Sequence, residues 1–219
     1  STGVRAEALT VGAASDESSS SVFLSSPKGI THITGEMSLS ASGAKSSATL
    51  DVAGGGSKLQ FDGVWTVTSS GYQSKADVLL NQPTATGGDV IFAKNIAMNV
   101  SGTGSSSNLI LNQQNGAVGS INVAGISLTN NAKSAAVDSS SQLTLLTAKG
   151  NFSASGPLNF SANGENSSII YRIGTQSALD VNTKGDTTLQ GPIVQRASGA
   201  GSTAQGFISA AGSVSSDSS

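Results

Sequence analysis

The feature of this sequence that most restricts its fold is a burst of alternating apolar and polar residues that returns about every 30 residues. Within each burst, the apolar side chains at every second position lie on one face of an extended chain, as in a half-buried β-strand. Breaks that contain glycine separate the bursts. No apolar spacing with a helical period is sustained, and only the stretch 4–11 is a weak helical candidate. The sequence therefore predicts an all-β chain.

Three sets of apolar residues mark this recurrence. The first set returns at intervals close to the period: Met37, Trp65, Met98, Leu128 and Leu158. The second set returns at similar intervals: Leu50, Val78, Leu109, Val137 and Ile169. A third set is less regular: Leu59, Val90, Val118, Leu146 and Leu179. Three strands and three corners per repeat predict a parallel β-solenoid (β-helix) with coils of about 30 residues. An antiparallel β-sandwich or jelly roll remains the alternative, because its strands also recur about every 8 to 12 residues.

Composition separates a core from two ends. Residues 30–195 carry the recurrence and are expected to form the solenoid or sandwich core, with Trp65, Phe61, Met98 and Phe160 as its apolar anchors. We expect residues 1–29 to be an N-terminal arm or cap that can supply a strand to a neighbouring subunit, because unpaired strands bind other chains. Residues 196–219 are expected to be a C-terminal tail rich in Ser, Gly and Ala.

The charge and cysteine content disfavour several classes of protein. The chain has a net charge of −2, and 11% of its residues are charged, so no basic surface for a phosphate backbone is expected and nucleic acid is not a predicted partner. It contains no cysteine, which excludes disulfides and thiolate metal sites. No apolar run approaches the roughly 18 residues of a membrane helix, so membrane insertion is not expected.

Residues with catalytic chemistry are few. His32 is the only histidine, and we expect it to be structural or on the surface because a lone imidazole forms no metal site by itself. Asp51, Asp62, Asp77 and Asp89 form the densest group of carboxylates. With a coil of about 30 residues, Asp51 and Asp77 would stack on adjacent coils, where like charges raise a pKa or bind a cation unless they face solvent. We predict no catalytic residues, no metal site and no cofactor; a carbohydrate-active enzyme built on carboxylates stays open.

Four sequons for N-glycosylation occur, and they bear on the chain only if it is exported from a cell that glycosylates asparagine. Their asparagines are Asn99, Asn151, Asn159 and Asn166. Thr66 and Thr68 form one Thr-x-Thr pair, but the sequence gives it no threonine partners on successive coils, so ice binding is not expected.

The segments 148–164 and 177–191 consist of short alternating repeats rich in Ser, Gly and Asn. In this texture, the chain resembles bacterial β-helical surface proteins, namely autotransporter passengers and filamentous haemagglutinin-type adhesins. The resemblance includes no diagnostic motif, and it implies an exported or cell-surface β-helix with an adhesive or structural role, including a role in biofilm.

Two functions follow as hypotheses. The first is an extracellular structural protein, a self-assembling fibre subunit or adhesin segment that forms homopolymers and contacts host or cell-surface glycans. The alternative is a carbohydrate-binding or carbohydrate-cleaving β-helix, such as a phage tail-fibre component.

Overall fold

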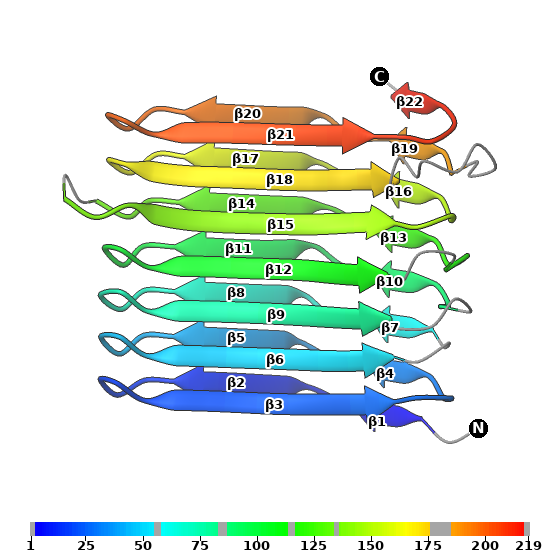
Figure 1. Cartoon of the computed structure of the whole chain (residues 1–219), viewed down its shortest axis with the longest axis horizontal. Coiled ribbons are helices and arrows are strands. Elements are labelled where there is room, and N and C mark those ends of the chain that lie inside the picture. The colour runs from blue at the N-terminus through cyan, green and yellow to red at the C-terminus, as the bar shows by residue number, and fades with distance from the viewer. Residues whose placement is uncertain are drawn as a thin grey trace.

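The computed structural model describes residues 3–54, 58–82, 87–113, 117–133, 136–175 and 185–216. In these residues the chain forms 22 strands and no helix, and the strands build three parallel sheets stacked along one axis (Figure 1). We name them sheets A, B and C. The predicted parallel β-solenoid is confirmed, and the antiparallel sandwich alternative is wrong because every strand pair is parallel.

The three sheets differ in strand length. Sheet A has eight strands: β1 (Val4–Ala6), β4 (Thr31–Ile33), β7 (Leu59–Phe61), β10 (Val90–Phe92), β13 (Ile121–Val123), β16 (Phe152–Ala154), β19 (Thr187–Leu189) and β22 (Val214–Ser216). Sheet B has seven: β2 (Leu9–Ala13), β5 (Met37–Ala41), β8 (Trp65–Ser69), β11 (Ile96–Val100), β14 (Ile126–Asn130), β17 (Leu158–Ala162) and β20 (Ile193–Ala197). Sheet C has the longest strands: β3 (Ser19–Ser26), β6 (Ser47–Gly54), β9 (Lys75–Gln82), β12 (Ser106–Gln113), β15 (Ser139–Thr147), β18 (Ser167–Thr175) and β21 (Thr203–Ser209).

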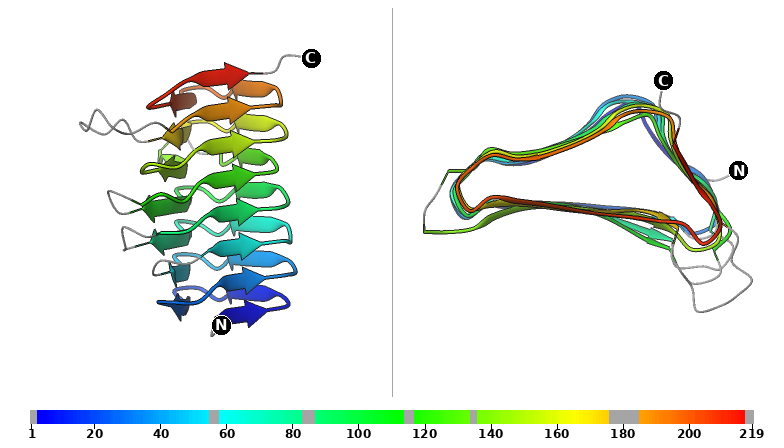
Figure 2. Two further views of the ribbon diagram at one scale, coloured as in Figure 1. Left: turned by 90° about the vertical axis from the view of Figure 1, so that its right-hand side faces the viewer. Right: turned by 90° about the horizontal axis from the view of Figure 1, so that it is seen from above.

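Each coil takes one strand from each sheet in the order A, B, C. Viewed along the stack, the coils superimpose on an elongated triangle whose sides are the three sheets, and the two termini lie at opposite ends of the rod (Figures 1 and 2). Each strand between the ends of its sheet therefore pairs with its equivalents in the coils before and after it, and the first and last strands have one such partner each. Contacts of this kind join nearest neighbours only, so the rod is held together coil by coil.

The core lies inside the triangle. Strands alternate between buried and half-buried residues, as Met37–Ala41 and Trp65–Ser69 do, because successive side chains point to opposite faces of a sheet. The four anchors predicted from the sequence are each at most 1% exposed, which confirms their place in the core: Trp65, Phe61, Met98 and Phe160.

Aromatic rings fill the interior at two levels. Phe61 packs edge-on against Trp65, with ring centroids 4.6 Å apart, and stacks on Phe92 at 5.2 Å. Further along the rod, Phe160 stacks on Tyr171 with ring centroids 3.6 Å apart. The edge-on and stacked pairs of Phe61 add to the stabilisation from area burial alone.

The strand pairing corrects several of the register predictions. Met37 and Trp65 do face each other, but the next members of that column are Ile96 and Ile126, two positions before the expected Met98 and Leu128. Both choices point inward, so the alternation alone leaves the register undetermined by two positions.

In the later coils, the second set differs from the observed pairing because the corners between sheets B and C differ in length. In the second set, Leu50, Val78 and Leu109 align, but Leu143 takes the place expected for Val137. Residues 131–138 connect β14 to β15, whereas residues 101–105 connect β11 to β12, and the longer corner moves the strand along the sequence. Tyr171, not Ile169, follows Leu143.

The third set also differs from the observed pairing, although residues 83–89 and 114–120 form connections of equal length before β10 and β13. Leu59 and Val90 align as expected, but Ile121 takes the place expected for Val118, which is 67% exposed in a corner. Leu146 belongs to β15 in sheet C, and Leu179 lies outside the described residues.

A repeated turn forms the corner between sheets B and C. It has the pattern Gly-x-x-Ser, in which the serine hydroxyl donates to the carbonyl of the glycine three positions earlier, as Ser46 does to Gly43 at 2.7 Å. The residue before each serine has positive φ. The glycine is required because a Cβ atom at Gly71 would clash with the carbonyl oxygen of Gly43 in the preceding coil. The same turn recurs at Gly43–Ser46, Gly71–Ser74, Gly102–Ser105, Gly164–Ser167 and Gly199–Ser202.

Both ends of the described chain belong to the stack. Within 1–29, β1, β2 and β3 pair with β4, β5 and β6, so the weak helical candidate 4–11 lies in β1, in β2 and in the corner between them. Within 196–219, β21 and β22 continue sheets C and A. The composition boundaries at 29/30 and 195/196 therefore coincide with no break in the sheets.

Candidate functional site

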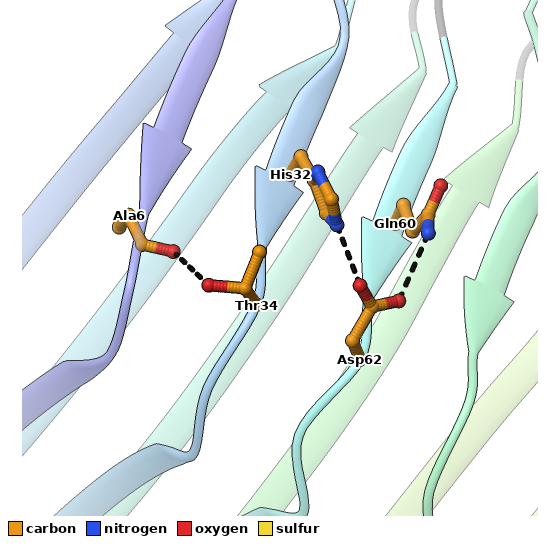
Figure 3. Close-up of polar contacts among 5 residues, drawn as sticks. All are labelled: Ala6, His32, Thr34, Gln60 and Asp62. Carbon is orange, nitrogen blue, oxygen red and sulfur yellow. Dashed lines mark hydrogen bonds and ion pairs between the residues drawn. The ribbon is translucent and has the colours of Figure 1, made fainter.

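The only histidine takes part in a small polar cluster on the outer face of sheet A (Figure 3). His32 lies on β4, and its Nε2 is 2.7 Å from Oδ2 of Asp62, which follows β7 in the next coil. Gln60 of β7 donates to the other oxygen, Oδ1, at 2.9 Å. Two hydrogen bonds lower the pKa of the Asp62 carboxyl below its ordinary value, because both donors favour the charged form. The hydrogen bond from His32 has the larger effect, and that from Gln60 has the smaller.

This cluster has the donors and acceptors of a dyad but not of a nucleophilic triad. Both oxygens of Asp62 are occupied, and the side chains of His32 and Asp62 are 23% and 34% exposed. Nearby, Thr34 donates to the carbonyl oxygen of Ala6 at 3.4 Å, away from the imidazole (Figure 3). Among the hydrogen bonds of the described residues, none joins a serine or threonine hydroxyl to His32. The arrangement ties adjacent coils together.

The carboxylates of sheet C do not stack, contrary to the expectation. Asp51 lies opposite Leu79, and Asp77 lies opposite Thr49, so the two aspartates are displaced by two positions on neighbouring strands. Asp51 accepts a hydrogen bond from Asn81 at 2.8 Å. The predicted stack is wrong because the two aspartates are closer together in the sequence than the positions that pair between these two strands.

Asp77 has partners of its own. It accepts a hydrogen bond from Asn108 at 2.7 Å and forms an ion pair with Lys75 at 2.8 Å. In the described parts of the chain, no three His, Asp or Glu side chains are grouped so that they could hold a metal ion.

A ladder of side-chain oxygens runs along the corner that precedes sheet A. Each oxygen accepts from the backbone N–H of the equivalent residue in the next coil: Asp89 from Ser120 at 2.9 Å, Ser120 from Asn151 at 3.1 Å, Asn151 from Asp186 at 2.9 Å, and Asp186 from Ser213 at 2.8 Å. Two hydrogen bonds from Ser213 lower the pKa of the Asp186 carboxyl. The backbone N–H has the larger effect and the hydroxyl the smaller. Asp89, the last of the four carboxylate candidates, is therefore a rung of this ladder.

The four sequon asparagines occupy different environments. Asn99 is exposed and Asn159 half-buried, and both lie on strands of sheet B. Asn151 is an exposed rung of the ladder described above. Asn166 lies in a corner turn with φ of 49°, next to Gly201.

An open groove of about 300 Å³ lies beside sheet A at β10, β13 and β16. Its lining combines the apolar Ile91 with the amide of Asn122 and the hydroxyls of Ser153 and Ser155, and no charged side chain takes part. Ser153 donates to Asn122 at 2.5 Å. Neutral hydrogen-bonding groups beside an apolar side chain suit an uncharged polar ligand.

The corner between sheets C and A contains a buried amide ladder that was not predicted from the sequence. Gln113 donates to the side-chain oxygen of Gln82 at 2.8 Å, and it accepts from the backbone N–H of Ala148 at 2.9 Å. The signal was available, because Gln82 and Gln113 are one period apart and each ends a sheet C strand. Such an inward polar column satisfies backbone groups where the chain turns.

The described chain has no helix that is long and apolar enough to span a membrane. It matches no protein-family model, no curated protein and no solved structure.

Proposed function

We propose that this chain is a non-enzymatic structural segment of an extracellular or cell-surface protein, a self-assembling fibre subunit or a part of an adhesin. The single observation that carries the proposal is the exposed core at the β20–β22 end of the rod. Leu158 is fully buried, yet its partner Ile193 in the last sheet B strand is 40% exposed. Thr187 is buried, yet its partner Val214 is 56% exposed.

The opposite end carries complementary features. The inward-facing Leu9, Val22 and Leu24 of the first coil are only partly buried although they pack on the core. In the described chain, strands β2 and β3 have one paired side each, so backbone N–H and C=O groups on the other side can pair with another chain. A second copy that stacks on either end would bury these apolar side chains and complete the ladders.

Two outward-facing phenylalanines at opposite ends of sheet C favour the same stacking. In the sheet C pairing, Phe23 and Phe207 occupy the same outward column at opposite ends of the rod, and they are 64% and 54% exposed. Stacking that continues the register would bring Phe207 of one copy beside Phe23 of the next. The resemblance to autotransporter passengers and filamentous haemagglutinin-type adhesins agrees with such a rod on a cell surface, and with glycans as external partners.

Electron microscopy tests this proposal. We expect the wild-type chain to form filaments whose length grows with concentration in negative stain. A variant with Ile193→Lys and Val214→Lys, called the end variant below, should form short particles because charge is placed on the stacking surface. The matched control, Thr49→Lys with Gln142→Lys on the outer face of sheet C, should still form filaments. Short wild-type particles at every concentration would overturn the fibre proposal.

The groove beside sheet A favours a second candidate, the binding of a neutral carbohydrate. Its amide and hydroxyl groups suit sugar hydroxyls, and Ile91 provides an apolar contact. A glycan array with the wild-type chain and with Asn122→Ala tests it: a signal that Asn122→Ala loses supports the candidate, and the absence of any signal removes it.

A further inference from the structure

The outer face of sheet C differs from those of sheets A and B because it carries many large apolar side chains. The outward positions of sheets A and B hold one such residue each, Ile91 and Val194. Sheet C holds six: Phe23, Leu79, Ile110, Leu146, Ile170 and Phe207. The two phenylalanines are 64% and 54% exposed, and the other four side chains are half-buried. Apolar residues gathered on one face in this way indicate a surface that a partner covers.

One outward column of sheet C has a symmetric pattern along the rod. From the first strand to the last, it consists of Phe23, Asp51, Leu79, Ile110, Thr144, Arg172 and Phe207. Ile110 of β12 is its middle member, and two charges of opposite sign, Asp51 and Arg172, lie two strands to either side. The phenylalanines occupy its two ends. The column is therefore complementary to its own reversed order.

The two charges of this column have no oppositely charged partner among the described residues. Asp51 accepts a hydrogen bond from a neutral amide. Arg172 lies over the ring of Phe207, with its Cζ atom 5.5 Å from the ring centroid. The other two charged side chains of the face, Lys75 and Asp77, form an ion pair with each other at 2.8 Å. Asp51 and Arg172 are thus the two charges of the face that can pair with another molecule.

We propose that the outer face of sheet C binds the same face of a second copy of this chain, about a two-fold axis that lies between the two sheets and runs parallel to β12. Such an axis reverses the order of the coils and keeps each position along the strands. Ile110 then meets Ile110 of the second copy at the centre, and Asp51 of each copy meets Arg172 of the other. Phe23 and Phe207 meet in the same way at the two ends of the column.

The remaining charges of the face fit this arrangement. Lys75 would face Ser140 of the second copy and Asp77 would face Gln142, because β9 and β15 lie on either side of β12. No like charges therefore oppose each other, whereas like charges that meet across an interface weaken it strongly.

A two-fold axis along the rod would fit the same face less well. It would keep the coils in order and reverse the strands, so neighbouring columns would exchange places. Asp51 would then face Thr49 and Arg172 would face Ile170, which leaves both charges without a counter-charge. Centred on the column itself, that axis would place Asp51 against Asp51. The charges therefore favour the axis parallel to the strands.

The size and shape of the face allow a stable dimer. Seven strands, most of eight residues, cover about 900 Å² per partner, compared with about 800 Å² in a standard stable interface. The strands of each sheet overlie one another along the rod, so the face is flat enough to meet a second one over its whole length (Figure 2). This contact lies on the side of the rod and does not require end stacking, so it goes beyond the proposed fibre.

Charge exchange tests the contact, in the end variant so that end stacking does not contribute. Sedimentation velocity at increasing concentration measures the dissociation constant of the dimer. Asp51→Arg would place arginine opposite Arg172 at two equivalent points, so we expect the dissociation constant to rise by about 100-fold. Arg172→Asp should have the same effect. The double exchange, Asp51→Arg with Arg172→Asp, makes the facing charges opposite again and should restore the dimer.

Glu36→Arg is the matched control, because it makes the same change in net charge at an exposed residue between β4 and β5, away from sheet C. It should leave the dissociation constant unchanged. An end variant that is monomeric at every concentration, or a double exchange that does not restore the dimer, would overturn the inference. Filaments of the wild-type chain seen together with that result would leave the fibre proposal standing. Dimers restored by the exchange, seen with short wild-type particles, would remove the fibre alone.

Cross-linking tests the direction of the axis, since the chain has no cysteine of its own. Ser106→Cys at the rim of the face lies on β12, so its two thiols would face each other across sheets about 10 Å apart. Thr203→Cys occupies the equivalent position on β21, where the two thiols would be roughly 30 Å apart. With a short bis-maleimide in the end variant, we expect Ser106→Cys to form covalent dimers at least about tenfold faster. Equal rates would overturn the proposed axis, because an axis along the rod separates both pairs of thiols equally.

Discussion

The two faces of strand β9 in sheet C differ in burial and in the contacts that they make. Ala76, Val78 and Leu80 point inward and are fully buried, whereas the intervening Asp77 and Asn81 are half-buried on the outside. The inner column is filled by apolar volume, and the outer column is held by hydrogen bonds between coils. Because packing inside leaves few alternatives and water competes outside, the inner face should govern stability and the outer face should govern recognition.

The largest expected effect belongs to the inner face. Trp65→Ala should lower the free energy of unfolding by about 3 to 5 kcal/mol, because it removes the ring that contacts Phe61 and Phe92 and leaves a cavity. Urea unfolding followed by circular dichroism measures the change. Tyr72→Ala, at an aromatic residue that is 48% exposed, serves as the control and should have a change of about 0.5 kcal/mol or less. Equal losses in both variants would contradict the contrast between the faces.

The corner glycines should come next. Gly71→Ala should destabilise the chain by about 2 to 3 kcal/mol, because the new Cβ would meet the backbone of Gly43. Gly12→Ala is the matched control, since its Cβ would approach only the Ser40 side-chain oxygen, at 3.4 Å. Thermal unfolding of the two variants gives the comparison, and a well-tolerated Gly71→Ala would mean that the corners can separate without loss of packing.

Outer carboxylates should have smaller effects. Asp51→Ala and Asp77→Ala should each change stability by about 1 kcal/mol or less, because their partners are half-exposed and solvated. A double-mutant cycle between Asp51 and Asn81 isolates the coupling across one coil boundary. A coupling as large as the loss in Trp65→Ala would invert the assignment of roles to the two faces.

The smallest expected effect is a pH dependence at the His32 cluster. The pKa of Asp62 is lower in the folded than in the unfolded chain, so its contribution is fully present above the ordinary aspartate range and is lost as pH falls through the folded pKa. Its size should be under about 1 kcal/mol because solvent screens the pair.

A carboxyl titration by NMR measures this pKa. We expect His32→Ala to raise the pKa of Asp62 toward its ordinary value and Gln60→Ala to raise it less, in the order of their contributions. An ordinary Asp62 pKa in the intact chain would show that the hydrogen bond at 2.7 Å does not persist in solution.

The sequence alone determined that this chain is all-β, because the alternation is local, and its period of about 30 residues predicted a solenoid. The parallel pairing of the strands was needed to exclude the antiparallel sandwich. It placed Trp65, Phe61, Met98 and Phe160 inside because apolar residues at every second position share one face. It also contained the corner pattern from Gly43–Ser46 to Gly199–Ser202, which follows from the need for a glycine beside the preceding coil.

Only the tertiary structure decided the register and the partners. Ile96 and Met98 are equally apolar and face the same way, so pairing along the whole sheet was needed to choose between them. His32, which contacts Asp62, and Asn81, which donates to Asp51, each belong to the neighbouring coil, one full period away in sequence, and a shift of two positions would change these contacts. The outward side chains of sheet B likewise form one face only after the coils stack, because residues distant in sequence become neighbours at the spacing of paired strands.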